Sequence, residues 1–247
     1  NDRDADTWFN RGNALTDLER YEEAVTAYEP GLVQRPDDWE AWQNKALALI
    51  SLDRPSDAVV ALERVLAIRP NDADAWNNKG SVLDRLGRHE EAVTAYDRAL
   101  ELNPSHAEGW KNKGLALHRL GRFEESVEAY NRALSIDPDH AVSWNNKGNA
   151  LHRLGRHEEA LAAYDQALSR NPNHPIGWRN KGLALHKLGR YAEAITAYDK
   201  AIAIKQDDAE LWYNKGNALN RLGKFKEALA ALDRALALDP DDAAAWN

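Results

Sequence analysis

The chain has 247 residues, a formal net charge of −8 and no cysteine, which excludes disulfides, thiolate metal sites and cysteine nucleophiles. No stretch approaches the roughly 20 apolar residues that span a bilayer, and no signal-peptide core is present, so we expect a cytoplasmic protein with no membrane partner. The acidic balance also argues against nucleic acid as the partner.

Tryptophan recurs every 34 residues along nearly the whole chain, at Trp8, Trp42, Trp76, Trp110, Trp144, Trp178, Trp212 and Trp246. Taking it as the fourth position of a unit gives seven repeats, 5–38, 39–72, 73–106, 107–140, 141–174, 175–208 and 209–242. Residues 243–247 open an eighth repeat, which we interpret as the cut edge of a longer array. Such a period predicts a single repeat array, 5–242, with no second domain.

Each repeat is predicted to form two helices. In the first, Trp110, Gly114 and Leu117 of repeat four show the spacing of one helical face. A capping glycine ends this helix in five repeats, at Gly87, Gly121, Gly155, Gly189 and Gly223. Glu19 and Asp53 replace that glycine in the first two repeats.

The second helix opens with acidic residues, which suit the positive end of a helix dipole. Proline ends it at Pro36, Pro70, Pro104, Pro138, Pro172 and Pro240. Small residues at the eighth and twentieth positions of the repeat would let the paired helices approach closely. Pro30 and Gly31 fall inside the second helix of repeat one, which we expect to be kinked or shortened, at a cost of ~3 kcal/mol.

The motif W-x2-K-G-x2-L…G…EEA…AY…AL…P resembles the tetratricopeptide repeat in all seven units. The resemblance implies an all-α fold, a right-handed superhelical solenoid of antiparallel helix pairs, and a protein that binds other proteins. A basic residue replaces the family's usual aliphatic residue at the seventh position, at Arg11, Lys45, Lys79, Lys113, Lys147, Lys181 and Lys215. We expect its stem to pack beside the core and its charged end to reach water.

Asparagine occupies the sixth position of every repeat, on the helix face opposite tryptophan, at Asn10, Asn44, Asn78, Asn112, Asn146, Asn180 and Asn214. Asparagine is a poor residue for an exposed helix interior, so the row needs an explanation. It resembles the asparagine ladder of the O-linked N-acetylglucosamine transferase superhelix. That resemblance implies amides that line a concave groove and hold the backbone of an extended peptide. The alternatives are hydrogen bonds between neighbouring helices, or inheritance by duplication.

Basic residues on the same side predict an acidic ligand. They occupy the thirteenth position at Arg85, Arg119, Arg153, Lys187 and Arg221, and the fifth at Lys111 and Arg179. Because arginine pairs bidentately with carboxylates, we expect the groove to prefer an acidic segment or a C-terminal carboxylate. The alternative is a solvated charged face.

Histidine occupies the twelfth position in three successive repeats, at His118, His152 and His186. We add them to the predicted peptide site, with a protonation-sensitive groove as one consequence. A metal site is not expected, because neighbouring helices lie 8–10 Å apart and no ligand set completes the coordination sphere. The remaining histidines, His89, His106, His140, His157 and His174, are expected to fill packing or connector positions.

The sequence therefore predicts a protein–protein interaction scaffold that binds an extended, acidic peptide in its concave groove. No nucleophile, acid–base pair or phosphate-binding loop stands out, so we expect neither catalysis nor a cofactor. Two alternatives stay open. In the first, the chain is the substrate-recruiting or regulatory arm of a larger enzyme whose catalytic domain is absent. In the second, it is a self-assembling array whose exposed ends stack.

Overall fold

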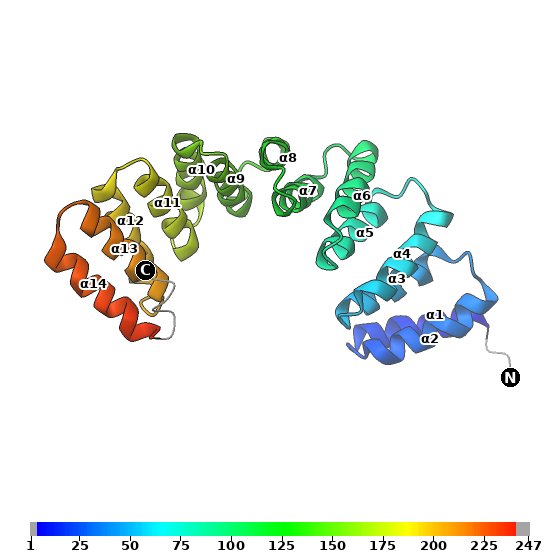
Figure 1. The fold of residues 1–247 in the computed structure, drawn as a ribbon. Coiled ribbons are helices and arrows are strands. Elements are labelled where there is room, and N and C mark those ends of the chain that lie inside the picture. Colours follow the sequence, from blue (N-terminus) through cyan, green and yellow to red (C-terminus); the bar gives the residue numbers. More distant parts are fainter. Residues whose placement is uncertain (1–3, 241–247) are drawn as a thin grey trace. The chain divides into compact units, whose positions relative to one another are not determined.

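The computed structural model describes residues 4–240, and within this range it contains 14 α-helices and no strand (Figure 1). The first seven are α1 (Ala5–Asp17), α2 (Tyr21–Gln34), α3 (Trp39–Ser51), α4 (Pro55–Ile68), α5 (Ala73–Arg85), α6 (His89–Leu102) and α7 (Ala107–Arg119). The others are α8 (Phe123–Ile136), α9 (Ala141–Arg153), α10 (His157–Arg170), α11 (Pro175–Lys187), α12 (Tyr191–Ile204), α13 (Ala209–Arg221) and α14 (Phe225–Leu238). None of these described helices is long and apolar enough to cross a membrane. Trp246 and the truncated repeat 243–247 lie outside the described residues.

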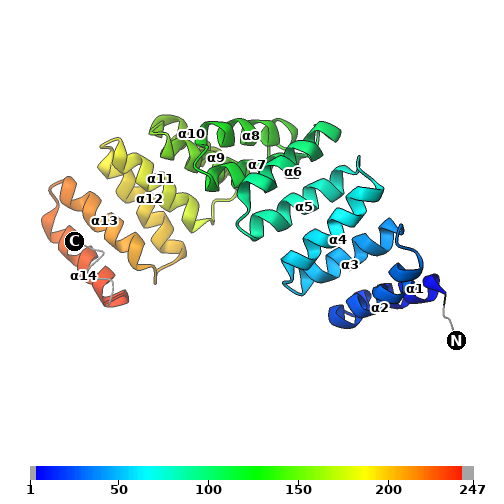
Figure 2. The same ribbon diagram turned by 45° about the vertical axis from the view of Figure 1, so that its right-hand side comes forward.

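The helices form two compact units, which divide between Arg122 and Phe123, inside repeat four. The first unit holds α1 to α7 and the second holds α8 to α14. Within each unit every helix packs against the next one along the chain (Figure 2). First helices of neighbouring repeats also touch, as α9 and α11 do, so that they form one layer of each unit.

Glycine and tyrosine set the close approach of the two helices in a pair. A Cβ atom on Gly148 would lie 2.5 Å from Cε1 of Tyr164, and Gly80 stands in the same relation to Tyr96. The tyrosine rings are fully buried. A larger residue at the glycine would displace a ring from the core, which is the packing role expected of the eighth position.

The turn after each first helix keeps one backbone geometry. The capping glycines have φ between 74° and 81°, and Glu19 and Asp53 adopt the same left-handed region with φ of 57° and 55°. The turn is therefore imposed by the packing of the helix pair, even where no glycine relieves the strain of a side chain.

The second helix of repeat one was expected to be kinked or shortened, and it is not shortened. Helix α2 runs over 14 residues, as all the other second helices do, with Pro30 inside it. Gly31 makes room for Phe9, because a Cβ atom there would lie 2.4 Å from the Phe9 ring. Packing of that ring under the helix offsets the hydrogen bond that proline removes.

The lysines of the seventh position are more strongly engaged than expected. Lys79 Nζ lies 2.9 Å from Glu63 Oε1 of the preceding repeat and 5.6 Å from the centroid of the Trp76 ring. The charged ends thus form ion pairs and cation–π contacts instead of simply reaching water. Lys147 keeps the cation–π contact, 5.0 Å from the centroid of the Trp144 ring, but Asn131 stands where its acidic partner would be. Burial lowers the pKa of Lys147.

Three connector histidines have a role that the sequence analysis did not assign. Nδ1 of His106, His140 and His174 accepts a hydrogen bond from the backbone N–H three residues later, at 3.0 to 3.1 Å. They are the N-caps of α7, α9 and α11, where aspartate serves in the other repeats.

Candidate functional site

One face of every first helix carries the second, sixth, ninth and thirteenth positions of the repeat. These positions are spaced by four, three and four residues, so they form a stripe along the helix. We call it the first-helix stripe. In α9 it consists of Val142, Asn146, Asn149 and Arg153. Because first helices of one unit are neighbours, their stripes lie side by side within that unit.

Two of the seven row asparagines bind the preceding repeat. Asn44 Nδ2 donates a hydrogen bond of 2.9 Å to Asn13 Oδ1. Asn180 Nδ2 donates to Asn149 Oδ1 at 2.9 Å and to Asn145 Oδ1 at 3.3 Å. In both cases the preceding repeat has asparagine at its ninth position. Hydrogen bonds between neighbouring helices, the alternative considered above, therefore account for part of the row.

The other asparagines keep hydrogen-bonding capacity. Asn10 is exposed, and Asn78, Asn112, Asn146 and Asn214 are half-buried. Among the described residues, the Asn214 Nδ2 atom and the Oδ1 atom of Asn77, one position before Asn78, are buried without a hydrogen-bond partner. Burying an amide atom without a hydrogen-bond partner costs free energy.

The basic row differs between the two units. In the first unit Arg85 Nη2 lies 2.8 Å from Asp53 Oδ1, and Arg119 pairs with Asp84. In the second unit Arg153 lies over the Phe123 ring. Within the part of the chain that the structure describes, Arg153, Lys187 and Arg221 have no carboxylate partner. The row is thus neutralised in one unit and open in the other.

The two fifth-position bases are already paired. Lys111 pairs with Glu108 of the same helix, and Arg179 Nη1 lies 2.7 Å from Glu210 Oε2 of the next first helix. Each therefore contributes less free positive charge than the sequence predicts, because a neighbouring carboxylate offsets it.

Two of the row histidines, His152 and His186, face the second helix of their own repeat. The His152 and His157 ring centroids are 4.7 Å apart, and the His186 ring meets Tyr191 edge-on at 5.1 Å. Burial lowers the pKa of both His152 and His186. His118 is half-buried at the equivalent place in α7. Within residues 4–240 no three histidine, aspartate or glutamate side chains gather as a metal site would require.

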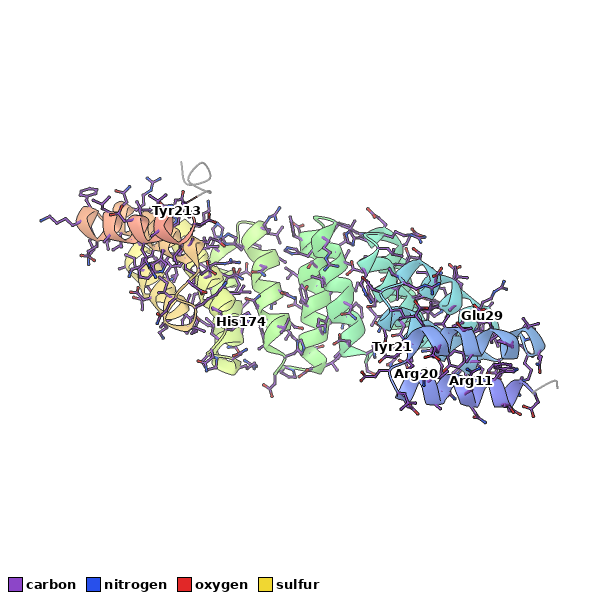
Figure 3. The ribbon with its side chains drawn as sticks, turned by 90° about the horizontal axis from the view of Figure 1, so that it is seen from below. Arg11, Arg20, Tyr21, Glu29, His174 and Tyr213 are labelled. Atoms are coloured by element: carbon purple, nitrogen blue, oxygen red, sulfur yellow. The ribbon has the colours of Figure 1, made fainter. Side chains whose placement is uncertain are left out.

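A pocket of about 310 Å³ opens between α9 and α11 in the second unit. It is lined by Ala141, Val142, Asn145, Asn146, Asn149, Ala167, Leu168, Asn171, His174 and Ile176. His174 lies at the beginning of α11 (Figure 3). A pocket of about 300 Å³ lies at the equivalent place between α1 and α3, where Asp6, Arg35, Asp38 and Glu40 make its wall charged.

Val142 and Ile176 were not among the site residues predicted from the sequence. The second position is acidic in the other five repeats, at Asp6, Glu40, Asp74, Glu108 and Glu210. Aligning the repeats on their tryptophans would have revealed this break, because two successive apolar residues interrupt an acidic row on the predicted ligand face.

Comparison with protein families gives a match over most of the chain. Models of the tetratricopeptide repeat match residues 9–75, 44–104, 77–141 and 145–209, and a further model of the same repeat matches 209–242. A search of curated proteins gave no match.

Solved structures of the same architecture are numerous. YrrB, described as a TPR protein with an unusual peptide-binding site, is 24% identical, covers 73% of this chain and 93% of its own, and has a TM-score of 0.65. The MamA protein is 23% identical; the match covers 68% of this chain and 92% of MamA, with a TM-score of 0.66. The C-terminal part of a TPR repeat-containing protein from Cytophaga hutchinsonii is 17% identical. The match covers 96% of this chain and 97% of that structure, with a TM-score of 0.79. These likenesses concern the fold, and with the family matches they show that the chain belongs to the tetratricopeptide repeat family, as an all-α solenoid of helix pairs.

Proposed function

We propose that the chain is a protein-interaction scaffold that binds an extended, acidic segment of another protein on its first-helix stripes. Asparagine amides of the stripes hydrogen-bond the peptide groups, and the open basic residues contact its carboxylates. An amide offers a donor and an acceptor, as a peptide group does. Each hydrogen bond contributes about 0.5–1.5 kcal/mol, so several amides act together.

The observation that carries this proposal is the open basic row of the second unit. Arg153, Lys187 and Arg221 are exposed at the same place on three neighbouring first helices, without carboxylate partners among the described residues. They occur in a chain whose net charge is −8. Three like charges on one face of an acidic protein repel one another, and an acidic ligand would relieve that repulsion.

The test measures binding of a fluorescein-labelled acidic peptide of about 12 residues by anisotropy, at several salt concentrations. The variant Arg153→Ala, Lys187→Ala, Arg221→Ala is expected to bind about tenfold more weakly, with a shallower dependence on salt, because each exposed pair contributes under about 1 kcal/mol. The matched control is Arg85→Ala, Arg119→Ala, which removes two residues of the same row that are already paired.

The affinity of the control variant for the acidic peptide is expected to change by less than about threefold. Equal losses in the two variants would show that position along the row does not matter, and salt-independent binding would remove the basic row from the site. A further variant, Asn78→Ala, Asn146→Ala, Asn214→Ala, tests the amides without disturbing Asn44 and Asn180, which hold neighbouring helices together.

Self-association is the second candidate, and the exposed apolar residues of α14 favour it. Phe225 is 68% exposed and Leu229 is 62% exposed. Exposed apolar side chains gathered on one helix are typical of an interaction surface. Such a surface would join two copies of the chain through α14, and it leaves the first-helix stripes free for a peptide.

A further inference from the structure

Two exposed apolar side chains interrupt an otherwise acidic row where that row begins the first helix. Val142 is 54% exposed and Ile176 is 48% exposed. An acidic residue at this place would interact favourably with the positive end of the helix dipole, and it would remain hydrated. Neither residue contributes to the core in proportion to its apolar area. Stability of the isolated chain therefore does not explain their presence.

Both side chains line the pocket between α9 and α11, together with amides on the adjoining wall. Asn145 is 7% exposed and Asn180 is 8% exposed, so each is more than nine-tenths buried. Asn145 Oδ1 and Asn149 Oδ1 both accept hydrogen bonds from Asn180 Nδ2, which fixes the orientation of the two acceptors. The pocket thus combines an apolar rim with amides held in place before any ligand arrives.

The size and composition of the pocket select the kind of occupant. A volume of about 310 Å³ lies at the lower limit of small-molecule sites, which run from roughly 300 to 1,000 Å³. The site therefore suits one side chain with its peptide groups better than a larger cofactor. Val142, Ile176 and Leu168 offer apolar surface to that side chain, while the amides match the peptide groups on either side of it.

We infer that this pocket binds an aliphatic side chain of the partner segment, leucine or isoleucine, and so fixes where along the array that segment docks. The inference rests on the proposed function. Hydrogen bonds to peptide groups do not distinguish one part of an extended chain from another, whereas an apolar pocket between two repeats does. Arg153 and Lys187 lie about 16 Å away, at the other end of the same two helices, and they then contact acidic residues about five positions along the extended segment from the aliphatic one.

The pocket between α1 and α3 provides an internal comparison. It has a similar volume of about 300 Å³, but Asp6 and Glu40 occupy the places of Val142 and Ile176. An aliphatic side chain entering that pocket would desolvate two carboxylates. One chain thus offers an apolar and a charged version of the same inter-repeat pocket.

The experiment uses a set of fluorescein-labelled peptides with one variable residue, leucine, isoleucine, alanine or lysine, at the centre of a constant background of serine and glutamate. Anisotropy titrations give the affinity of the whole chain for each. The parent protein is expected to bind the leucine and isoleucine peptides about tenfold more tightly than the alanine peptide. The longer side chains remove up to three more carbon atoms from water when they enter the pocket.

The variant Val142→Gln, Ile176→Gln removes the apolar rim without adding charge, and it is expected to bind all four peptides within about threefold of one another. The matched control, Asp6→Gln, Glu40→Gln, changes the charged pocket and is expected to keep the tenfold preference. Circular dichroism of each variant checks that the helices remain intact.

The outcomes separate the two proposals. Binding of acidic peptides by the parent without a leucine preference overturns the aliphatic pocket and leaves the proposed function standing. A leucine preference that survives in Val142→Gln, Ile176→Gln also overturns it, because the preference then arises elsewhere. If no peptide binds the parent, the proposed function fails, and the pocket inference fails with it.

Discussion

His152 shows how the setting of one residue couples stability to pH. Burial lowers its pKa, and the nearby positive groups of His157, Lys187 and Arg153 lower it further. These groups come from α10, from α11 and from α9 itself. In the unfolded chain this histidine is free of them and takes up a proton near pH 6.5.

The direction of the pH effect follows from that shift. Between the unfolded value of about 6.5 and the lower pKa of the folded state, the unfolded chain binds more protons. The stability that His152 contributes is therefore present above pH 6.5 and is lost as the pH falls through the folded pKa.

We expect the melting temperature of the parent to fall between pH 8 and pH 5, and the melting temperature of the variant His152→Asn to fall less. Asparagine already occupies the equivalent position in repeat seven, at Asn220. Thermal unfolding followed by circular dichroism at both pH values measures the difference. Identical pH dependence in parent and variant would show that His152 is not among the groups responsible.

At the scale of the helix, the sequence predicts most of what the structure contains. Periodicity and the glycine and proline positions predict the paired helices, because each signal acts within a few residues of the helix end. Pro30 is the instructive failure: local propensity favours a break there, but Gly31 lets Phe9 pack against the helix and α2 continues.

The candidate site was only partly predictable, because its charges and amides are set by distant residues. Whether Asn180 is free depends on Asn149, 31 residues earlier, and whether Arg85 is neutralised depends on Asp53, 32 residues earlier. A repeat alignment can propose such pairs but cannot show their distances. The apolar break at Val142 and Ile176 was visible in the sequence, whereas their exposure and the pocket between them required the structure.

The first two repeats carry avoidable strain in the turn between their helices. Glu19 and Asp53 hold the left-handed conformation that glycine adopts in five other repeats. A residue with a side chain pays roughly 1–2 kcal/mol there, although aspartate tolerates the conformation better than glutamate does. Glycine also adds entropy to the unfolded chain, which reduces the gain.

We therefore expect Glu19→Gly to stabilise the protein by about 0.5–1 kcal/mol and Asp53→Gly by less. Urea unfolding measures both free energies. The control is Gly155→Ala, which introduces strain at an equivalent turn and is expected to destabilise by a comparable amount; its neighbourhood is open, so no clash confuses the result. A destabilising effect of Glu19→Gly would mean that the glutamate side chain makes a contribution larger than the strain.

At the scale of the whole molecule, repeat stacking decides which apolar residues are covered. Leu161 of α10 is only 6% exposed, because the next repeat packs against that helix. Leu229 occupies the same position in α14 and is 62% exposed. The exposed side chains of α14 have the composition of an inter-repeat interface, so they suit contact with a second copy of the chain.

Self-association through α14 is expected to raise the average mass in sedimentation equilibrium as the protein concentration increases. The variant Leu229→Gln, Leu236→Gln is expected to weaken the association at least tenfold, since burying each leucine contributes roughly 1.5–3 kcal/mol. The variant Val142→Gln, Ile176→Gln serves as the control, because it changes apolar residues on the first-helix stripe and leaves α14 intact. A constant monomer mass would exclude association, and an equal loss in the control would move the contact from α14 to the stripe. If only the α14 variant loses the rise in average mass, α14 joins the copies while the stripes stay available to a peptide. The two candidate functions are then compatible in one molecule.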